Sequence, residues 1–512
     1  MLKRIVKALA AQGASLFSPT ALVIGLLVLA LFLRVINISS HSLWYDEAQV
    51  VVLSRLPFTT MFWGLLSLDP HPPLHYAQLK LWNLPGEHEV WIRLNSVFWG
   101  GLGVLLVFAF AKKHFGWKAA GLAGFLVAIS PFHLWYSQEV RMYALSFFAA
   151  GALMWVAYNF FFNAELERWQ KFSLPLLTAA VLGLHSGYFL ALAGLYGFVV
   201  LLWLFDRGRL RGRLQPFLLG QAPVLILYAP FLYMHRNIRL EHLSLPAWHD
   251  VFGTYANFLC GDSVGSPAII FLGKLSVAVV IILAFFAIRH NRPMLLFIGA
   301  FMVLPAAAMF ALSILRHPMY RHPPLIYTGF PLVMLVAHAF FQRPGKSALI
   351  FKSAFAIVVG LTVYGLLYQF QNTQRQDIRG AAQFVRSQFR PATDLAVTIG
   401  DRELWSFNWY FLGPDYPYQP FNGWRVFASN DTSVTFGGVY SAPDSTIQRV
   451  FAGKQRIFFI NLNSFSNRDR RIFDILHANG FQPATHKILH GAEIFLYQRR
   501  AASHASAALL KY

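Results

Sequence analysis

Two adjacent carboxylates follow the first long apolar segment of the chain. Asp46 and Glu47 lie in the stretch SLWYDEAQVV, directly after the aromatic residues Trp44 and Tyr45, which suit the headgroup level of a membrane. Neighbouring residues on a helix point in different directions, so the two acids are expected to have separate roles. One would act as a general base, and the other would orient it or cap a helix. The alternative is a solvated loop whose acids only cap a helix N-terminus.

A second polar loop contains two histidines. In LDPHPPLHYAQ, Asp69 is expected to cap a helix with prolines in its first turn. His71 and His75 would then share one helical face. Such a pair can bind a metal, but the sequence has no H-E-x-x-H signature. We therefore interpret His75 as a packing or capping residue and keep His71 as a candidate ligand.

Further charged residues flank later apolar segments. Glu139 and Arg141 occur in SPFHLWYSQEVRMYAL, and Arg321 occurs in HPMYRHPPLIYTGFP. An ionisable side chain beside hydrocarbon is costly and is therefore a functional candidate. The planar guanidinium group suits a phosphate. The alternative for each arginine is that its side chain extends along the apolar surface and places the charged group among the lipid headgroups.

The composition indicates where these residues act. The chain has 512 residues, of which 56% are hydrophobic and 13% are charged, so it is predicted to be an integral membrane protein. Its formal charge of +21 lies mainly in short loops, where Lys and Arg set topology and contact anionic lipids. Nucleic acid is therefore not expected as a partner. The single cysteine, Cys260, excludes an internal disulfide framework.

Eleven segments are long and apolar enough to be predicted as membrane spans. They lie near residues 17–36, 92–111, 118–134, 142–162, 173–185, 187–205, 215–234, 267–288, 294–315, 324–341 and 348–369. Every second loop between them is basic, which predicts a cytoplasmic N-terminus. The first span lacks a small-residue cleavage site and is followed directly by the acidic stretch, so it is predicted to remain uncleaved. The acidic and histidine-rich loops would then share the outer side of the membrane.

The composition changes after about residue 370. We predict a transmembrane domain over residues 1–370, an extracytoplasmic α/β domain over 371–500 and a disordered tail over 501–512. TQRQDIRGAAQFVRSQF has helical spacing, whereas DLAVTIG, QRIFFINL and AEIFLYQRR have the pattern of short buried strands. No G-x-G-x-x-G motif follows a strand, so a dinucleotide site is not predicted.

Several motifs together carry a resemblance to a known family. WYDEA, D-x-HPPL-x-Y, GEHEVWIRL, YSQEVRMYAL and an arginine before the tenth span occur in this order. They resemble the protein O-mannosyltransferase-like branch of the glycosyltransferase-C (GT-C) superfamily, which includes the aminoarabinose transferase of lipid A. The resemblance covers about residues 15–370. It implies a helical polytopic enzyme of the bacterial inner membrane that takes a sugar from a polyprenyl-phosphate donor and inverts the anomeric carbon.

The resemblance also implies roles for individual residues. Asp46 would be the base, Glu139 the second-loop acid and Arg321 a phosphate contact. The family often has Arg-Tyr before the tenth span, whereas this chain has Tyr320 before Arg321 and His322 after it. The identity of the residue that contacts the phosphate therefore stays open among these neighbours. Some relatives use a divalent cation, so a Mg or Mn ion is a candidate cofactor.

These considerations define a predicted site and its partners. The predicted residues are catalytic Asp46, Glu47 and Glu139; phosphate-binding Arg93, Arg141 and Arg321; a substrate pocket of Trp44, Tyr45, Asp69, His71, Tyr76, Gln138 and Tyr143; and metal-ligand candidates Asp46, Glu139 and His71. The predicted partners are the polyprenyl-phosphate sugar, membrane lipids and an unidentified lipid, glycan or protein acceptor. Acceptor choice is assigned to RNIRLEHLSLPAWHD and the C-terminal domain.

Three alternative functions compete with a glycosyltransferase. A transporter or flippase of lipid-linked sugars would place polar residues near mid-membrane and often shows repeated spans. The predicted spans are nearly free of charge apart from Lys274, and no repeat is apparent. An acyl- or phosphoethanolamine-type transferase would need a motif such as G-x-S-x-G, which is absent. A pseudoenzyme whose external domain binds a partner is the third alternative.

Overall fold

The computed structural model describes residues 18–64, 71–234, 236, 243–261, 266–342, 346–372, 375–398, 403–413, 435–436, 444–462 and 470–500. The chain forms two compact units. The helical unit comprises Met1–Ile38, Pro57–Gly86 and Val90–Thr373. The α/β unit comprises Ser39–Leu56, Glu87–Glu89 and Gln374–Tyr512. The loop that carries the paired acids is thus grouped with the C-terminal region, whereas the composition set a boundary near residue 370.

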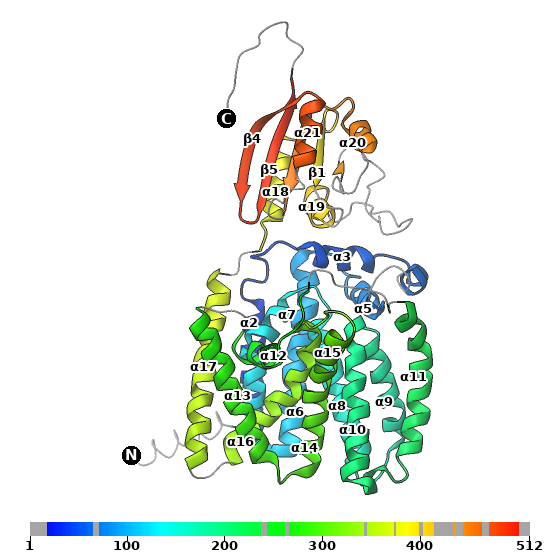
Figure 1. Ribbon diagram of the computed structural model, residues 1–512, viewed down its shortest axis with the longest axis vertical. Helices are drawn as coiled ribbons and strands as arrows, with labels where there is room; N and C mark the ends of the chain where they lie inside the picture. The colour runs from blue at the N-terminus through cyan, green and yellow to red at the C-terminus, as the bar shows by residue number, and fades with distance from the viewer. Residues whose placement is uncertain are drawn as a thin grey trace, which may run out of the picture. The chain divides into compact units, whose positions relative to one another are not determined.

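Long helices run alongside one another through the helical unit (Figure 1). They are α2 (Pro19–Val35), α6 (Glu89–Ile129), α8 (Tyr143–Phe162), α9 (Arg168–Leu182), α10 (Leu190–Phe205), α11 (Leu214–Met234), α13 (Pro267–Ile288), α14 (Arg292–Ile298) continuing through η4 (Gly299–Val303) into α15 (Leu304–Leu315), α16 (Gly329–Gln342) and α17 (Lys346–Asn372). Shorter elements connect them: η1 (Thr60–Gly64), α5 (Leu74–Trp82), α7 (Pro131–Gln138), η2 (Ser186–Phe189), η3 (Arg207–Leu210), α12 (Trp248–Cys260) and η5 (Pro323–Thr328).

The helices account for the predicted membrane spans. In the described part of the chain, eight helical stretches are long and apolar enough to cross a membrane. Each of the eleven predicted segments overlaps a helix. Eleven segments correspond to eight long stretches because α6 covers two segments and because α2 and α9 are shorter than the others. Gly116 divides α6 with a positive φ of 82°, a conformation that favours glycine. The prediction of a multi-pass membrane protein is confirmed.

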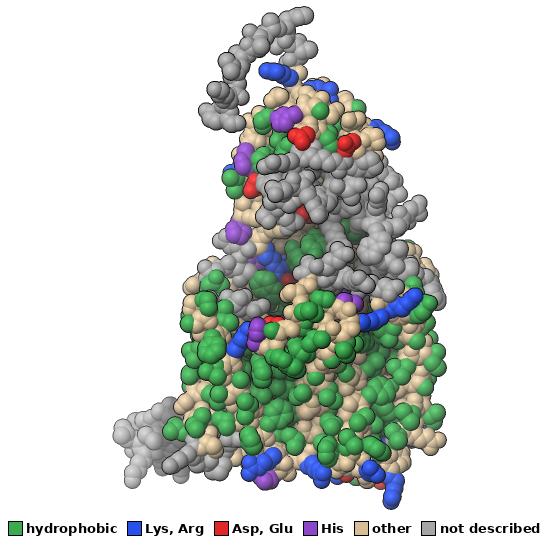
Figure 2. All heavy atoms as spheres, in the orientation of Figure 1, with side chains coloured by type: hydrophobic (Ala, Val, Ile, Leu, Met, Phe, Trp, Pro, Cys, Tyr) green, Lys and Arg blue, Asp and Glu red, His purple; other side chains and the backbone are tan. Residues whose placement is uncertain are grey.

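The surface of the helical unit is apolar where a soluble protein would be polar. A broad hydrophobic band covers its side, and Lys and Arg side chains gather at its lower end (Figure 2). Leu227 and Leu315 are 80% and 81% exposed. Lipid solvates such side chains without the free-energy cost that water would impose.

A buried arginine holds the short helix α7 in place. Arg34 is fully buried, and it donates hydrogen bonds to the carbonyls of Val127 and Ala128 at the end of α6 (both 3.2 Å). It also donates to Nδ1 of His133 in α7 at 2.8 Å. Cations suit helix C-termini, whose last carbonyls lack intrahelical partners. Arg34 therefore fixes the position of α7 and of the chain segment that follows it.

The α/β unit contains a five-stranded sheet in the order β2-β1-β3-β5-β4. Its strands are β1 (Asp394–Thr398), β2 (Thr435–Phe436), β3 (Arg456–Asn461), β4 (Phe481–Leu489) and β5 (Ala492–Arg499), and its helices are α3 (Tyr45–Ser54), α18 (Ile378–Gln388), α19 (Glu403–Phe411), α20 (Asp444–Phe451) and α21 (Arg470–Ala478). Strand β1 pairs parallel with β2 and β3, whereas β5 pairs antiparallel with β3 and β4.

Two apolar clusters cover the two faces of this sheet. Successive residues of β3 alternate between them, because Phe458 packs with α18 and α19 while Phe459 packs with α20 and α21. The predicted strands DLAVTIG, QRIFFINL and AEIFLYQRR and the amphipathic helix are confirmed as β1, β3, β5 and α18. Strand β4 was missed, because its sequence FQPATHKIL mixes polar and apolar residues without alternation and its side chains are mostly exposed. The predicted tail, 501–512, lies outside the described residues.

Candidate active site

The two adjacent acids diverge at the start of α3. The Glu47 side chain is fully buried, and its Oε2 accepts hydrogen bonds from the Trp44 backbone N–H at 3.3 Å and from Arg375 Nη1 at 3.2 Å. Glu47 therefore caps the helix and forms an ion pair. Asp46 is only half-buried. The structure brings Tyr45 to the same turn, with its ring 5.1 Å from that of Trp44.

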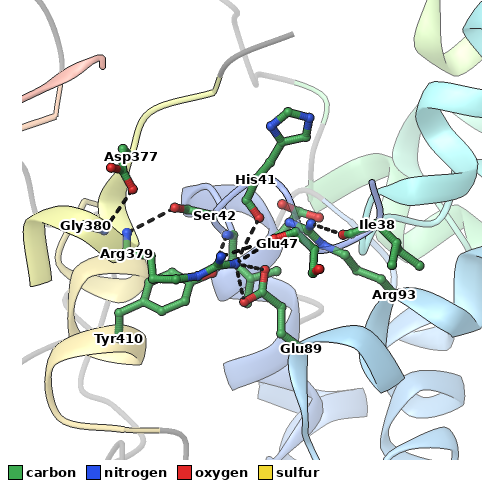
Figure 3. Close-up of polar contacts among 12 residues, drawn as sticks. Ile38, His41, Ser42, Glu47, Glu89, Arg93, Asp377, Arg379, Gly380 and Tyr410 are labelled. Carbon is green, nitrogen blue, oxygen red and sulfur yellow. Dashed lines mark hydrogen bonds and ion pairs between the residues drawn. The ribbon is translucent and has the colours of Figure 1, made fainter. Parts of the chain in front are cut away.

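The chain that leads into α3 is held by a second arginine. The Arg379 guanidinium donates to the carbonyls of Ser39 at 3.2 Å and His41 at 3.4 Å, and to the Glu89 carboxylate at 2.9 Å. Its backbone N–H donates to Ser42 Oγ at 3.0 Å. Figure 3 shows the Arg379 guanidinium between the Glu89 carboxylate and the His41 carbonyl. All of these contacts lie within the α/β unit.

A separate group of cationic and imidazole side chains lies in the helical unit. The rings of His71 and His185 are 4.3 Å apart. Both arginines, Arg141 and Arg321, act electrostatically on both histidines, and Arg141 also acts on His75. We call these five residues the cationic cluster. They come from four segments: the α5 region, the connection between α7 and α8, and the residues just before η2 and η5.

Tyr143 is the shared neighbour of the charged side chains. Its side chain is hydrogen-bonded to Arg141, and the charges of Arg321 and Glu139 also act on it. Glu139 is 3% exposed, and its Oε1 accepts a hydrogen bond from Trp135 Nε1 at 3.1 Å. Two arginines and one carboxylate give this group a formal charge of +1, because neutral histidines add none.

Burial keeps two of the histidines neutral. Burial first, and the charge of Arg141 second, lower the pKa of His75 to about 3. The pKa of His71 is well below its usual value, mainly through burial and also through His185 and the two arginines. Neutral imidazole donates through one nitrogen and accepts through the other. At neutral pH the two guanidinium groups therefore carry the positive charge of the cluster.

Several buried polar atoms of the cluster lack partners. Among the described residues, none forms a hydrogen bond with either ring nitrogen of His75, with Nε2 of His185 or with Nε of Arg321. Each buried polar atom without a partner costs free energy. A ligand rich in acceptor oxygens, such as a phosphate, would satisfy the Arg321 donor and any histidine N–H.

The residues that flank Arg321 face a different helix. The Tyr320 hydroxyl lies 2.7 Å from Thr254 Oγ1, and His322 hydrogen-bonds Asn257; both partners belong to α12. Of these three adjacent residues, Arg321 is the one whose charge acts on His71 and His185.

Other predicted residues have different positions. Gln138 Nε2 donates to the carbonyls of Arg34 at 3.0 Å and Ile36 at 2.8 Å, which end α2. Arg93 is 2% exposed and donates to the Ile38 carbonyl at 2.6 Å. The Tyr76 ring is buried 6.2 Å from that of His75.

The predicted metal pair is not a helical pair. Helix α5 begins at Leu74, so His71 precedes it, and the expected shared face with His75 is wrong. The expected cap, Asp69, lies outside the described residues. In the described ranges, no three His, Cys, Asp or Glu side chains are grouped to hold a metal. The candidates are divided, with Asp46 in the α/β unit and Glu139 and His71 in the helical unit.

Sequence reasoning missed His185, Arg375 and Arg379. His185 lies in LGLHSGY, where two apolar segments nearly meet, and a histidine at such a turn is a usable signal. Arg375 and Arg379 lie in a polar amphipathic stretch and resemble ordinary surface cations. No local pattern distinguishes them.

Comparisons with known proteins agree with the sequence motifs. Residues 70–234 match the family of dolichyl-phosphate-mannose-protein mannosyltransferases. This stretch includes every member of the cationic cluster except Arg321. No curated protein matches the chain in sequence.

Two solved structures have a similar fold. ArnT from Cupriavidus metallidurans in the apo state has a TM-score of 0.58 and 14% identity, over 93% of this chain and 98% of that chain. ArnT from the same organism bound to undecaprenyl phosphate has a TM-score of 0.60 and 14% identity, over 95% and 99%. The predicted fold class and the resemblance to an ArnT-like GT-C protein are confirmed.

Proposed function

We propose that this protein is a membrane glycosyltransferase that transfers a sugar from a polyprenyl-phosphate donor to a hydroxyl group of a lipid, glycan or protein. The observation that carries the proposal is the cationic cluster, which holds the buried Arg141, the half-buried Arg321 and unpartnered buried polar atoms. The mannosyltransferase match over residues 70–234 supports the reaction class. The similar fold of ArnT bound to undecaprenyl phosphate supports the donor class.

The transfer is a direct displacement. The acceptor oxygen attacks the anomeric carbon and forms the new glycosidic bond, while the bond from that carbon to the phosphate oxygen breaks. The bonding electrons leave with the polyprenyl phosphate, and the acceptor proton passes to the carboxylate of Asp46. A single displacement inverts the configuration of the anomeric carbon.

The combined charge of the cluster and Glu139 suits this reaction. A sugar-linked phosphate diester carries one negative charge, and the released monoester approaches two. The group formed by Arg141, Arg321 and Glu139 has a formal charge of +1 and would therefore bind the departing phosphate more tightly than the donor. Stabilisation that grows toward the transition state accelerates the reaction. Glu139 limits the charge, so the donor is not held too tightly to react.

The proposed location follows from the loop charges. We place the protein in the bacterial inner membrane with its N-terminus in the cytoplasm and its C-terminal region outside. The gathering of Lys and Arg at one end of the helical unit supports this orientation (Figure 2).

Transfer in lipid nanodiscs tests the proposal. Purified protein is incubated with a panel of radiolabelled polyprenyl-phosphate sugars and a bacterial lipid extract, with and without EDTA. Wild-type protein is expected to transfer label from at least one donor, and the Asp46→Asn variant is expected to lose most of that activity. Loss of transfer in EDTA, restored by Mg or Mn, would support the candidate cation. Movement of donor across the bilayer without any transfer would overturn the proposal in favour of a flippase.

A further inference from the structure

We infer that the C-terminal α/β region positions the catalytic carboxylate, and that Arg375 and Arg379 are the positioning residues. The inference rests on the proposed function, because it concerns the orientation of Asp46. It gives this region a role beyond the acceptor choice assigned from the sequence.

Arg375 contacts residues on both sides of Asp46. Its guanidinium forms the ion pair with Glu47, the next residue, at 3.2 Å. The same guanidinium lies 5.8 Å from the ring of Trp44, two residues before Asp46. The Arg375 and Glu47 side chains are 15% and 0% exposed, and a carboxylate so deeply buried depends strongly on its partner.

Arg379 fixes the chain before the helix. It donates to the carbonyls of Ser39 and His41, and its backbone N–H donates to Ser42. Its guanidinium also pairs with Glu89. One residue thus joins two peptide carbonyls, the Ser42 hydroxyl and a second segment of the unit (Figure 3).

Helix α19 contacts α3 near both ends. The Tyr410 hydroxyl accepts a hydrogen bond from the Leu43 N–H at 2.6 Å, just before the helix begins. The Arg55 guanidinium, just after the helix ends, lies 5.3 Å from the ring of Trp409. With both ends held, α3 has little freedom to rotate or slide, and Asp46 remains half-exposed on its first turn.

This arrangement predicts a specific kinetic effect. An error of about 1 Å in the position of a catalytic group can cost roughly 100-fold in rate. Loss of Arg375 should therefore lower kcat, because α3 gains freedom. The KM for the donor should change little, because the cationic cluster belongs to the helical unit and has no part in these contacts.

A matched control separates positioning from stability. The Arg456–Asp394 ion pair joins β1 and β3 of the same unit, and its side chains are also 15% and 0% exposed. These residues begin their strands, and Arg456 contacts Asp394, the Gln388 carbonyl and the Phe458 ring. The Arg456→Gln variant should therefore destabilise the unit as Arg375→Gln does, but leave kcat within about threefold of wild type.

The test measures kcat, donor KM and hydrogen–deuterium exchange of residues 43–55 in nanodiscs. We expect Arg375→Gln to lower kcat by about 10- to 100-fold with donor KM within about twofold, and to speed exchange in α3. Arg375→Lys should recover part of kcat, because it keeps the charge but not the planar fork. In an Asp46→Asn background, Arg375→Gln should cost almost nothing further, since it acts through Asp46.

Three results would overturn the inference. The first is unchanged exchange of residues 43–55 in Arg375→Gln. The second is an equal loss of kcat in Arg456→Gln, and the third is full additivity of Arg375→Gln with Asp46→Asn. Failure of the proposed function looks different, because wild-type protein would then transfer sugar from no donor. The exchange measurement still decides whether Arg375 holds α3 in that case.

Discussion

The start of α3 and the cationic cluster both bury ionisable groups, but among the described residues only those at the start of α3 have partners for all their buried polar atoms. Glu47 is capped by a backbone N–H and paired with Arg375. In the cluster, polar atoms of His75, His185 and Arg321 have no hydrogen-bond partner in the described part of the chain. Burial alone therefore does not identify a functional group; unsatisfied burial is the stronger indication of a ligand.

The two regions also differ in what surrounds their ionisable side chains. At the start of α3, the protein secures Glu47 and leaves Asp46 half-exposed. In the cluster, the two arginines face histidines kept neutral by burial. The first arrangement suits the delivery of one carboxylate to a substrate, and the second suits a phosphate.

The largest expected effect separates Asp46 from Glu47. Asp46→Asn should lower kcat by about 10²- to 10⁴-fold, the usual contribution of a general base, with donor KM nearly unchanged. Glu47→Gln should cost less in kcat and more in stability, because it keeps a hydrogen-bond acceptor at the cap but loses the ion pair. Initial rates of sugar transfer measure the effect on kcat, and thermal unfolding measures the effect on stability. Equal losses of rate would remove the distinction between the acids.

A smaller effect is expected at Arg321. Arg321→Gln should weaken binding of undecaprenyl phosphate by about 10- to 100-fold, since a charge-assisted hydrogen bond contributes about 1.5–3 kcal/mol. Arg321→Lys should recover only part of this affinity, because lysine lacks the planar fork of N–H donors of a guanidinium group. The control is Arg213→Gln, whose arginine donates to the Ala164 carbonyl and lies outside the cluster. Affinity is measured in nanodiscs by calorimetry, and wild-type affinity in Arg321→Gln would argue against a phosphate site.

Histidine titration should affect stability more modestly. The folded-state pKa of His75 is about 3, below the usual 6.5, so the unfolded chain binds a proton first as pH falls. Its contribution to stability is full above about pH 6.5 and is lost between there and about pH 3. The loss should be on the order of 1 kcal/mol at pH 5.5. Melting temperatures of wild type and His75→Gln across pH 5–8 test this, and parallel curves would contradict it.

The smallest expected effect concerns the contact between α19 and α3. Tyr410→Phe removes one hydrogen bond to the Leu43 N–H, which usually contributes about 1 kcal/mol. Exchange of the Leu43 amide should accelerate several-fold, while kcat falls by about twofold or less. A loss of kcat as large as that of Arg375→Gln would show that the hydroxyl, and not the ion pair, sets the position of α3.

Much of the fold followed from local sequence pattern. Apolar length predicted helices, because each span satisfies its own backbone within one segment, and short apolar runs predicted strands β1, β3 and β5. The pattern failed at β4, whose exposed edge position carries no apolar alternation. It also failed at α5, where the prolines precede the helix and leave His71 outside it.

The sequence by itself determined that this is a membrane protein, which residue types can transfer a proton or bind a phosphate, and that its motifs resemble GT-C enzymes. Tertiary structure alone decided which of these residues meet. Arg375 and Glu47 are 328 positions apart, and Arg321 reaches His71 from a distant segment. Residue type and spacing fix local geometry, but pairing across such distances depends on how helices and sheet pack, which no local pattern records.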